Sequence, residues 1–209
     1  MKLTLFGATG RTGKYLVEAA LARGYYVTAL ARNPAKLALQ SERLFTVEGD
    51  IQDPQKVSEA LVGADVVISV LGPTNNQPTF EVSTGMANIL AAMQAYGVRR
   101  LVVSSGAGVS DPNDAPRLVN HLIGALLKLT SRYVLEDMQR TVDLVQASDR
   151  DWTVVRVPML TDDPKTGKVK VGYVGKGTGS RISRADMADF MLKQATDNTY
   201  LCLAPAISN

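Results

Sequence analysis

A glycine-rich stretch near the start of the chain contains residues whose types and spacing could do chemistry. It reads Gly7-Ala8-Thr9-Gly10-Arg11-Thr12-Gly13 and lies between an apolar run, Lys2–Phe6, and a stretch with helical apolar spacing, Arg11–Arg23. In a strand–turn–helix unit, such glycines permit a tight turn, close approach of a pyrophosphate, and close packing of helix on strand. The helix N-terminus also attracts phosphate. The pattern predicts a dinucleotide site, and a turn that merely contains glycines is the other interpretation.

The residues after the second predicted strand bear on which dinucleotide binds. NAD sites usually place Asp or Glu there to bind the ribose 2′-hydroxyl, whereas this sequence has Arg32 and Lys36 and no acid. Both cations can reach one site if Pro34 opens a helix, and both would attract a 2′-phosphate. We therefore predict NADP(H) rather than NAD(H), with a solvated basic turn as the other interpretation.

Candidate adenine contacts follow the third predicted strand. The carboxylate of Asp50 can accept a hydrogen bond from the adenine amino group, and Ile51 can cover the ring. Asp53, directly before Pro54, is expected to be only the cap of a helix that runs to Leu61.

Candidate ribose and nicotinamide contacts end the next two predicted strands. The fourth ends at Leu71-Gly72, and the fifth ends at Ser104-Ser105-Gly106. Open α/β sheets bind ligands outside the carboxyl ends of their strands. Ser105 is therefore a weak catalytic candidate beside the nicotinamide ribose, and a simple turn hydroxyl is an equally open interpretation.

The sequence lacks the usual catalytic pairs. Many short-chain dehydrogenases use Tyr-x-x-x-Lys, in which the lysine favours the tyrosinate. Here Asp137 stands four residues after Tyr133, and a carboxylate favours the protonated phenol instead. We expect Tyr133 to pack or lie at the surface and His121 to lie on a helix surface. Any catalysis must then rest on the cofactor.

Short apolar runs alternate with helical stretches along most of the chain. Strands of this kind are buried on both faces of a parallel sheet. The prediction is a Rossmann-like, doubly wound, mainly parallel α/β sheet with helices on both faces. Residues 1–209 form one NAD(P)-binding domain, in which 158–209 are a C-terminal elaboration on the substrate side. The predicted strands are Lys2–Phe6, Tyr25–Ala31, Leu44–Glu48, Asp65–Leu71, Arg100–Ser104, Trp152–Val157 and Lys168–Val174, and the predicted helices are Arg11–Arg23, Asp53–Leu61, Phe80–Tyr96, Val134–Ala147 and Ser183–Ala195.

Composition excludes several functional classes. One cysteine, Cys202, and one histidine, His121, argue against disulfides and metal sites. The net charge of +3 comes from scattered residues, so a nucleic-acid partner is not expected. The apolar helix candidate Leu118–Leu129 is too short to span a bilayer, and the N-terminus does not resemble a signal peptide. We therefore expect a cytoplasmic protein with no membrane partner.

The chain resembles the atypical short-chain dehydrogenase/reductases that include the NmrA-like proteins, and within them the biliverdin-IXβ reductases, also called NADPH-dependent flavin reductases. The resemblance covers nearly the whole chain. It rests on Phe6-Gly7-Ala8-Thr9-Gly10-x-Thr12-Gly13, Arg32, Gly49-Asp50, Leu71-Gly72, Ala87-Asn88-Ile89-Leu90-Ala91-Ala92-Met93, Gly97-Val98, Arg181-Ile182-Ser183, Asp186 and Phe190-Met191-Leu192.

The resemblance implies a set of cofactor contacts and a monomeric protein. Thr9, Gly10, Arg11 and Thr12 would hold the phosphates. The 2′-phosphate would bind Arg32 and Lys36, the adenine would contact Asp50 and Ile51, and Leu71-Gly72 and Ser104-Ser105 would line the ribose and nicotinamide side. Pro158, Met159 and Leu160 would border the nicotinamide and an open substrate cleft.

Three departures from those reductases concern the substrate side. Met159 stands where they have a histidine after the proline, Met138 lies near the place of a second histidine, and Gly106 replaces a hydroxyl residue. Tetrapyrrole reduction is therefore less expected than flavin reduction, in which hydride passes directly to flavin N5 and the protein supplies mainly orientation.

Three functions follow from these observations. The first is an NADPH-dependent oxidoreductase acting on a planar acceptor, with free flavin (FMN or FAD) as a substrate and quinone or tetrapyrrole as other acceptors. The second is an NmrA-like sensor that binds NADP without turnover. The third, a sugar-nucleotide epimerase or dehydratase, is weakened by the missing Tyr-x-x-x-Lys.

Overall fold

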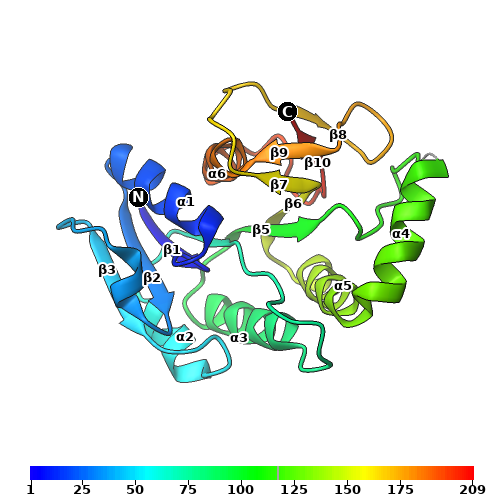
Figure 1. Cartoon of the computed structure of the whole chain (residues 1–209). Coiled ribbons are helices and arrows are strands. Elements are labelled where there is room, and N and C mark those ends of the chain that lie inside the picture. Colours follow the sequence, from blue (N-terminus) through cyan, green and yellow to red (C-terminus); the bar gives the residue numbers. More distant parts are fainter. Residues whose placement is uncertain (117) are drawn as a thin grey trace.

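A computed structural model describes residues 1–116 and 118–209, and in them eight strands form one sheet (Figure 1). Their order across the sheet is β3-β2-β1-β4-β5-β6-β10-β8, with a separate pair β7-β9. The strands are β1 Lys2–Phe6, β2 Tyr26–Ala31, β3 Leu44–Glu48, β4 Val66–Ser69, β5 Arg100–Gly106, β6 Asp151–Val157, β7 Met159–Thr161, β8 Lys170–Gly172, β9 Arg181–Ser183 and β10 Ala206–Ser208. The helices are α1 Arg11–Ala22, the 3₁₀ helix η1 Pro34–Leu37, α2 Pro54–Ala60, α3 Glu81–Ala95, α4 Leu118–Thr130, α5 Arg132–Ala147 and α6 Arg184–Lys193.

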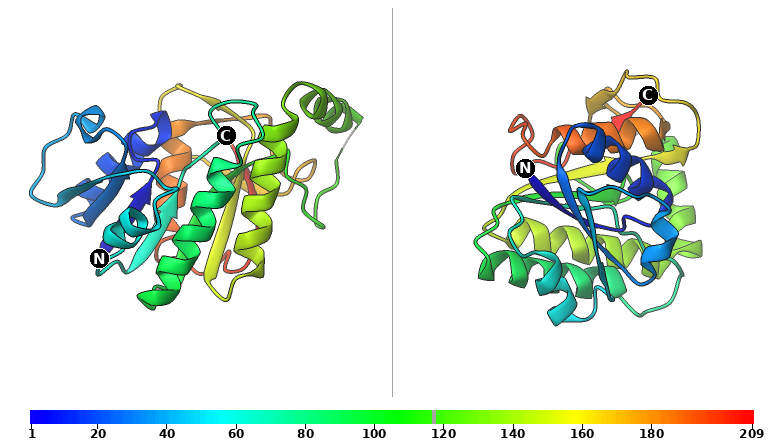
Figure 2. Two further views of the ribbon diagram at one scale, coloured as in Figure 1. Left: turned by 90° about the horizontal axis from the view of Figure 1, so that it is seen from below. Right: turned by 90° about the vertical axis from the view of Figure 1, so that its left-hand side faces the viewer.

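The first six strands are all parallel, which confirms the predicted doubly wound fold. β1 pairs with β2 on one side and β4 on the other, and the reversal of strand order at β1 places a crevice beside its carboxyl end. Helices cover both faces, with α1 and α6 on one and α2, α3 and α5 on the other (Figures 1 and 2). Each face has its own apolar core, because strand residues alternate between the two sides.

The C-terminal part is more elaborate than predicted. Lys168–Val174 was expected to be one strand, but only Lys170–Gly172 pairs, antiparallel to β10. β10 itself returns parallel to β6, and β7 pairs with β9. These strands have three residues each, too few for a periodic pattern to identify. Small boundary errors also occur: β4 ends at Ser69 instead of Leu71, and β5 continues to Gly106.

A buried ion pair fixes the segment that follows β5. The Arg156 side chain, in β6, is fully buried, and both ends of its guanidinium contact the Asp114 carboxylate at 2.7 and 2.8 Å. Arg156 also donates to the backbone carbonyls of Val109 and Ala204. Asp114 in turn accepts the backbone N–H of Val174 at 2.9 Å. One charge pair thus joins the β5–α4 connection, β6 and the β8 hairpin.

The Asp114–Arg156 pair predicts a pH-dependent stability. Burial opposes ionisation, but hydrogen bonds from Arg156 and the Asp111 N–H hold the pKa of Asp114 below its ordinary value. The stabilisation is therefore complete above the unfolded pKa of about 4 and is lost as pH falls through the folded value. Asp114→Asn leaves a buried cation without its partner, and should lower the free energy of unfolding at neutral pH by about 3–5 kcal/mol.

Denaturant unfolding at several pH values measures both effects. The exposed Asp163, which forms no ion pair in the described structure, provides the control, and Asp163→Asn should unfold like the parent. Equal stability of Asp114→Asn and Asp163→Asn at neutral pH would contradict this account of the pair.

Candidate cofactor and substrate site

The glycine-rich turn has the backbone geometry that phosphate binding needs. Gly7 has φ of +87°, a left-handed conformation that favours glycine, and the Gly10 N–H donates to the Gly7 carbonyl at 3.0 Å. Gly10 is the N-cap of α1, where no side chain caps the helix and no acid lies in the first turn. The N-terminal N–H groups and the helix dipole are therefore available to an anion, with no acidic side chain in the helix's own first turn.

Gly13 is the position at which helix α1 comes close to the turn formed by Gly7 and Ala8. A Cβ there would overlap the carbonyl oxygen of Gly7 and lie 2.7 Å from the Cα of Ala8. The first turn of α1 can rest on the end of β1 only because residue 13 has no side chain. This cradle fits the pyrophosphate of a dinucleotide, as the spacing predicts.

Arg11, predicted to hold a phosphate, forms an ion pair with Asp162 across 151 positions of sequence. Asp162 follows β7 and also pairs with Arg184 of α6 at 2.8 Å. Desolvation opposes its ionisation, but the two guanidinium groups hold the pKa of Asp162 below its ordinary value. The sequence analysis missed this acid, because nothing in a linear pattern brings residue 162 to the phosphate turn.

The predicted adenosine contacts lie after β2 and β3. Pro34 opens the 3₁₀ helix η1, Asn33 caps it, and both Arg32 and Lys36 are exposed. The Arg32 guanidinium lies 3.9 Å from the Asp50 carboxylate. The structure thus brings Arg32, predicted for the 2′-phosphate, close to Asp50, predicted for the adenine.

The other two residues of this group have structural contacts. A Cβ at Gly85 of α3 would lie 2.5 Å from Ile51, so the Ile51 side chain packs against that helix as well as bordering the predicted adenine site. Asp53 caps α2 by accepting the N–H groups of Gln55 and Lys56, as predicted.

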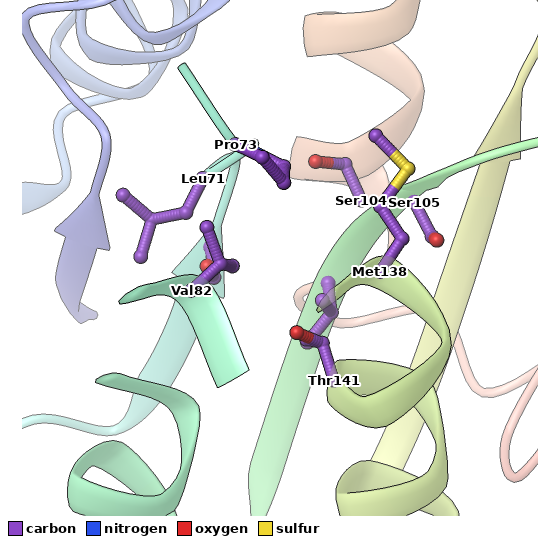
Figure 3. Close-up of a pocket in the computed structure, with 9 residues that line it drawn as sticks. Leu71, Pro73, Val82, Ser104, Ser105, Met138 and Thr141 are labelled. Carbon is purple, nitrogen blue, oxygen red and sulfur yellow. The ribbon is translucent and has the colours of Figure 1, made fainter. Parts of the chain in front are cut away.

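A hollow opens between the carboxyl ends of β4 and β5 and the helices α3 and α5 (Figure 3). In Figure 3 the Ser104 hydroxyl points toward Pro73 across the opening, whereas Ser105 points the other way. Ser105 and Ser69 are buried, and neither hydroxyl has a hydrogen-bond partner in the described structure. The lining residues are Ser69, Leu71, Pro73, Val82, Val103, Ser104, Ser105, Met138 and Thr141.

Several residues of this hollow were not predicted as site residues. Ser69, Val82, Met138 and Thr141 come from three elements, and only the folded chain brings them together. Gly106 and Met138, two positions at which the sequence differs from the resembled reductases, lie beside each other here. A Cβ at Gly106 would lie 3.1 Å from the sulfur of Met138, so a thioether fills the space beside the missing hydroxyl.

Asp137 has a structural role that explains the absence of a Tyr-Lys pair. Its buried carboxylate accepts the N–H groups of Val82 and Ser83, at 3.1 and 2.9 Å, and so caps the first turn of α3. Tyr133 packs its ring edgewise against Phe80, with 6.4 Å between ring centroids. Tyr133 is therefore a packing residue, as predicted. The His121 side chain lies outside the described part of the structure.

Pro158, Met159 and Leu160 lie at the end of β6 and in β7. Met159 is largely exposed, whereas Leu160 packs on the core that lies under α1 and α6. Gly72, beyond β4, has open space around it. The predicted nicotinamide-side residues thus lie at or just beyond the carboxyl ends of β4, β5 and β6, in agreement with the rule for open α/β sheets.

The described residues contain no group of three or more His, Cys, Asp and Glu side chains arranged to bind a metal ion. Among the same residues, no helix is both long enough and apolar enough to cross a membrane.

The fold and the glycine turn define a Rossmann-type nucleotide-binding protein, and comparison with known proteins specifies its family. Residues 7–198 match the NAD(P)H-binding family. The chain is 32% identical over 209 residues to the uncharacterized protein YwnB of Bacillus subtilis, covering 93% of this chain and 92% of YwnB. It spans only 37 to 62% of the length of five other curated relatives.

Solved structures share the fold. A short-chain dehydrogenase/reductase from Veillonella parvula in complex with NADP superposes with a TM-score of 0.81 at 22% identity, covering 100% of this chain and 94% of that one. ChuY, an anaerobilin reductase from Escherichia coli, superposes with a TM-score of 0.79 at 21% identity, covering 100% and 97%. The chain therefore belongs to the NAD(P)H-binding family.

The glycine turn supplies a sharp test of nucleotide binding. Gly13→Ala should weaken NADP binding at least tenfold, because the added methyl group must push α1 away from the turn that positions the phosphate. Gly124→Ala is the matched control, since open space surrounds Gly124 in α4. Isothermal titration with NADP measures both, and an unchanged affinity in a folded Gly13→Ala protein would place the phosphate elsewhere.

Cofactor choice has a separate test. Arg32→Ala should lower NADPH affinity by roughly tenfold to a hundredfold and leave NADH affinity nearly unchanged, because a charge-assisted contact contributes about 1.5–3 kcal/mol. Binding titrations with the two cofactors give the ratio. An unaltered NADPH/NADH ratio would rule out Arg32 as the selecting residue.

Proposed function

We propose that this protein is an NADPH-dependent oxidoreductase that transfers hydride to a planar acceptor, with free FMN or FAD as the substrate. The observation that carries the proposal is the chemistry of the hollow beside β4 and β5. Among the described residues that line it, none has a titratable side chain. Flavin reduction tolerates such a site, because hydride goes directly to N5 and the accompanying proton can come from water.

The residues of the chain have binding and orienting roles in this proposal. NADPH, when bound, supplies the hydride. The α1 N-terminus and Arg11 hold the pyrophosphate, and Arg32 with Lys36 holds the 2′-phosphate. Ser104 points into the opening and can orient the nicotinamide side. Met138 and the exposed Met159 offer soft apolar contacts to a flat ring.

The same residues favour flavin over a tetrapyrrole. ChuY is described as an anaerobilin reductase, so tetrapyrroles are a natural comparison. The present hollow, however, is lined by hydroxyl and apolar groups, with Met138 and Met159 in place of the histidines of the resembled reductases. A side-chain acid typically contributes about 10²–10⁴-fold to a rate, and the described lining supplies none.

Turnover assays test the proposal. The parent protein should oxidise NADPH with FMN or FAD, faster than with biliverdin or a quinone, and with little change between mildly acidic and mildly basic pH. Tyr133→Phe and Ser105→Ala should each keep the rate within about tenfold, since neither donates a proton in this scheme.

Two results would contradict it. A thousandfold loss in Tyr133→Phe with intact NADPH binding would reveal a proton donor. If the parent binds NADPH but reduces no acceptor, the protein is instead a sensor that binds NADP without turnover.

A further inference from the structure

Helix α4 exposes a continuous stripe of leucines. Leu118, Leu122, Leu126 and Leu129 are 84%, 71%, 60% and 84% exposed, and their spacing of four, four and three residues places them on one face of the helix. Exposed apolar residues elsewhere, such as Val62 and Phe45, do not belong to such a helical stripe. A contiguous apolar surface of this kind marks an interaction site.

The stripe is the outer face of a helix that is fixed at both ends. Before the helix, the Ala115 N–H donates to Val174 at 2.9 Å. At its end, Asn76 donates to the Thr130 carbonyl and accepts the Tyr133 N–H, both at 3.0 Å. On the inner side, the Leu127 side chain reaches toward Gly108. Figure 1 shows α4 projecting beyond α5 at the margin of the molecule.

The sequence that carries the stripe is basic. From residue 115 to residue 135 it contains Arg117, Lys128 and Arg132 and no Asp or Glu, between Asp114 and Glu136. Arg132 is exposed, and the exposed Lys176 lies in the hairpin that hydrogen-bonds to Ala115. In the part of the chain that the structure describes, neither Arg132 nor Lys176 forms an ion pair.

We propose that α4 binds the surface of a bilayer that contains anionic lipids, with the four leucines in the headgroup–acyl boundary and the exposed Arg132 and Lys176 at the headgroups. An apolar face flanked by Lys and Arg is the pattern of helices that lie in this interface. A second copy of the chain is a poorer occupant, since it would bring two sets of cations together without acids to pair them. The helix need not span the bilayer, so its short length is no obstacle.

The position of α4 gives such binding a consequence. α4 lies in the connection that leaves the carboxyl end of β5, the edge at which the hollow opens. Contact through α4 would keep this edge of the sheet near the bilayer.

Vesicle sedimentation with the full chain tests the proposal. The parent should bind vesicles of phosphatidylcholine mixed with phosphatidylglycerol, bind pure phosphatidylcholine vesicles much less, and dissociate as salt rises. Leu122→Glu with Leu126→Glu should weaken binding by on the order of tenfold or more. Val62→Glu with Phe45→Glu adds the same charge at exposed apolar positions away from α4, and should bind nearly as well as the parent, whereas Leu122→Gln with Leu126→Gln should also weaken binding.

NADP affinity and thermal stability, measured alongside, show that each variant is folded; the Gln pair replaces the Glu pair if the latter unfolds. Three outcomes would overturn the proposal: no binding to anionic vesicles, equal loss in the Val62/Phe45 variant, or a parent dimer that the α4 substitutions convert to monomer. The last outcome would assign the stripe to self-association.

Discussion

The close contact between α1 and the turn after β1 is the constraint on which the rest of the site depends. Because residue 13 carries no side chain, the helix begins directly on the strand end, and its N–H groups point into the crevice where the strand order reverses. The packing of α1 beside α6 then brings Arg184 and Asp162 to the same place as Arg11. The phosphate turn and the C-terminal elaboration are thereby joined by charge.

The parallel sheet and its helices could be predicted from the sequence because the buried strands are nearly all apolar and are separated by helical spacing. The glycine turn and the Asp53 cap depend on adjacent residues, so sequence spacing was sufficient for them. Two kinds of feature were not predicted. The three-residue strands β7, β9 and β10 depend on partners far away in sequence. β5 continues past the predicted end at Ser104 to Gly106, so Ser104 and Ser105 are consecutive strand residues that point in opposite directions.

Asp137 shows how one structural requirement limits the available chemistry. Its carboxylate satisfies two N–H groups at the start of α3, groups that have no partner within the helix itself. A lysine at this position could not accept those hydrogen bonds, so the capped α3 and a Tyr-Lys pair exclude each other here. The helix that carries Asp137 also places Met138 in the hollow. The apolar lining and the missing proton donor therefore arise from the same turn of α5.

The connection between β5 and α5 is anchored at Asp114 and exposes the leucines of α4. Asp114, held by a fully buried guanidinium and by the Val174 N–H, ties the chain to the body of the protein four residues before α4 begins. The four leucines that follow face outward on a helix whose two ends are tied to the body. Without a partner, α4 would be more stable with these leucines turned inward onto α5, because burying each side chain is favourable by about 1.5–3 kcal/mol. The buried ion pair and the backbone contacts hold α4 in an orientation that leaves this free energy unrealised in the isolated chain, which is the physical reason to assign its outer face to a partner.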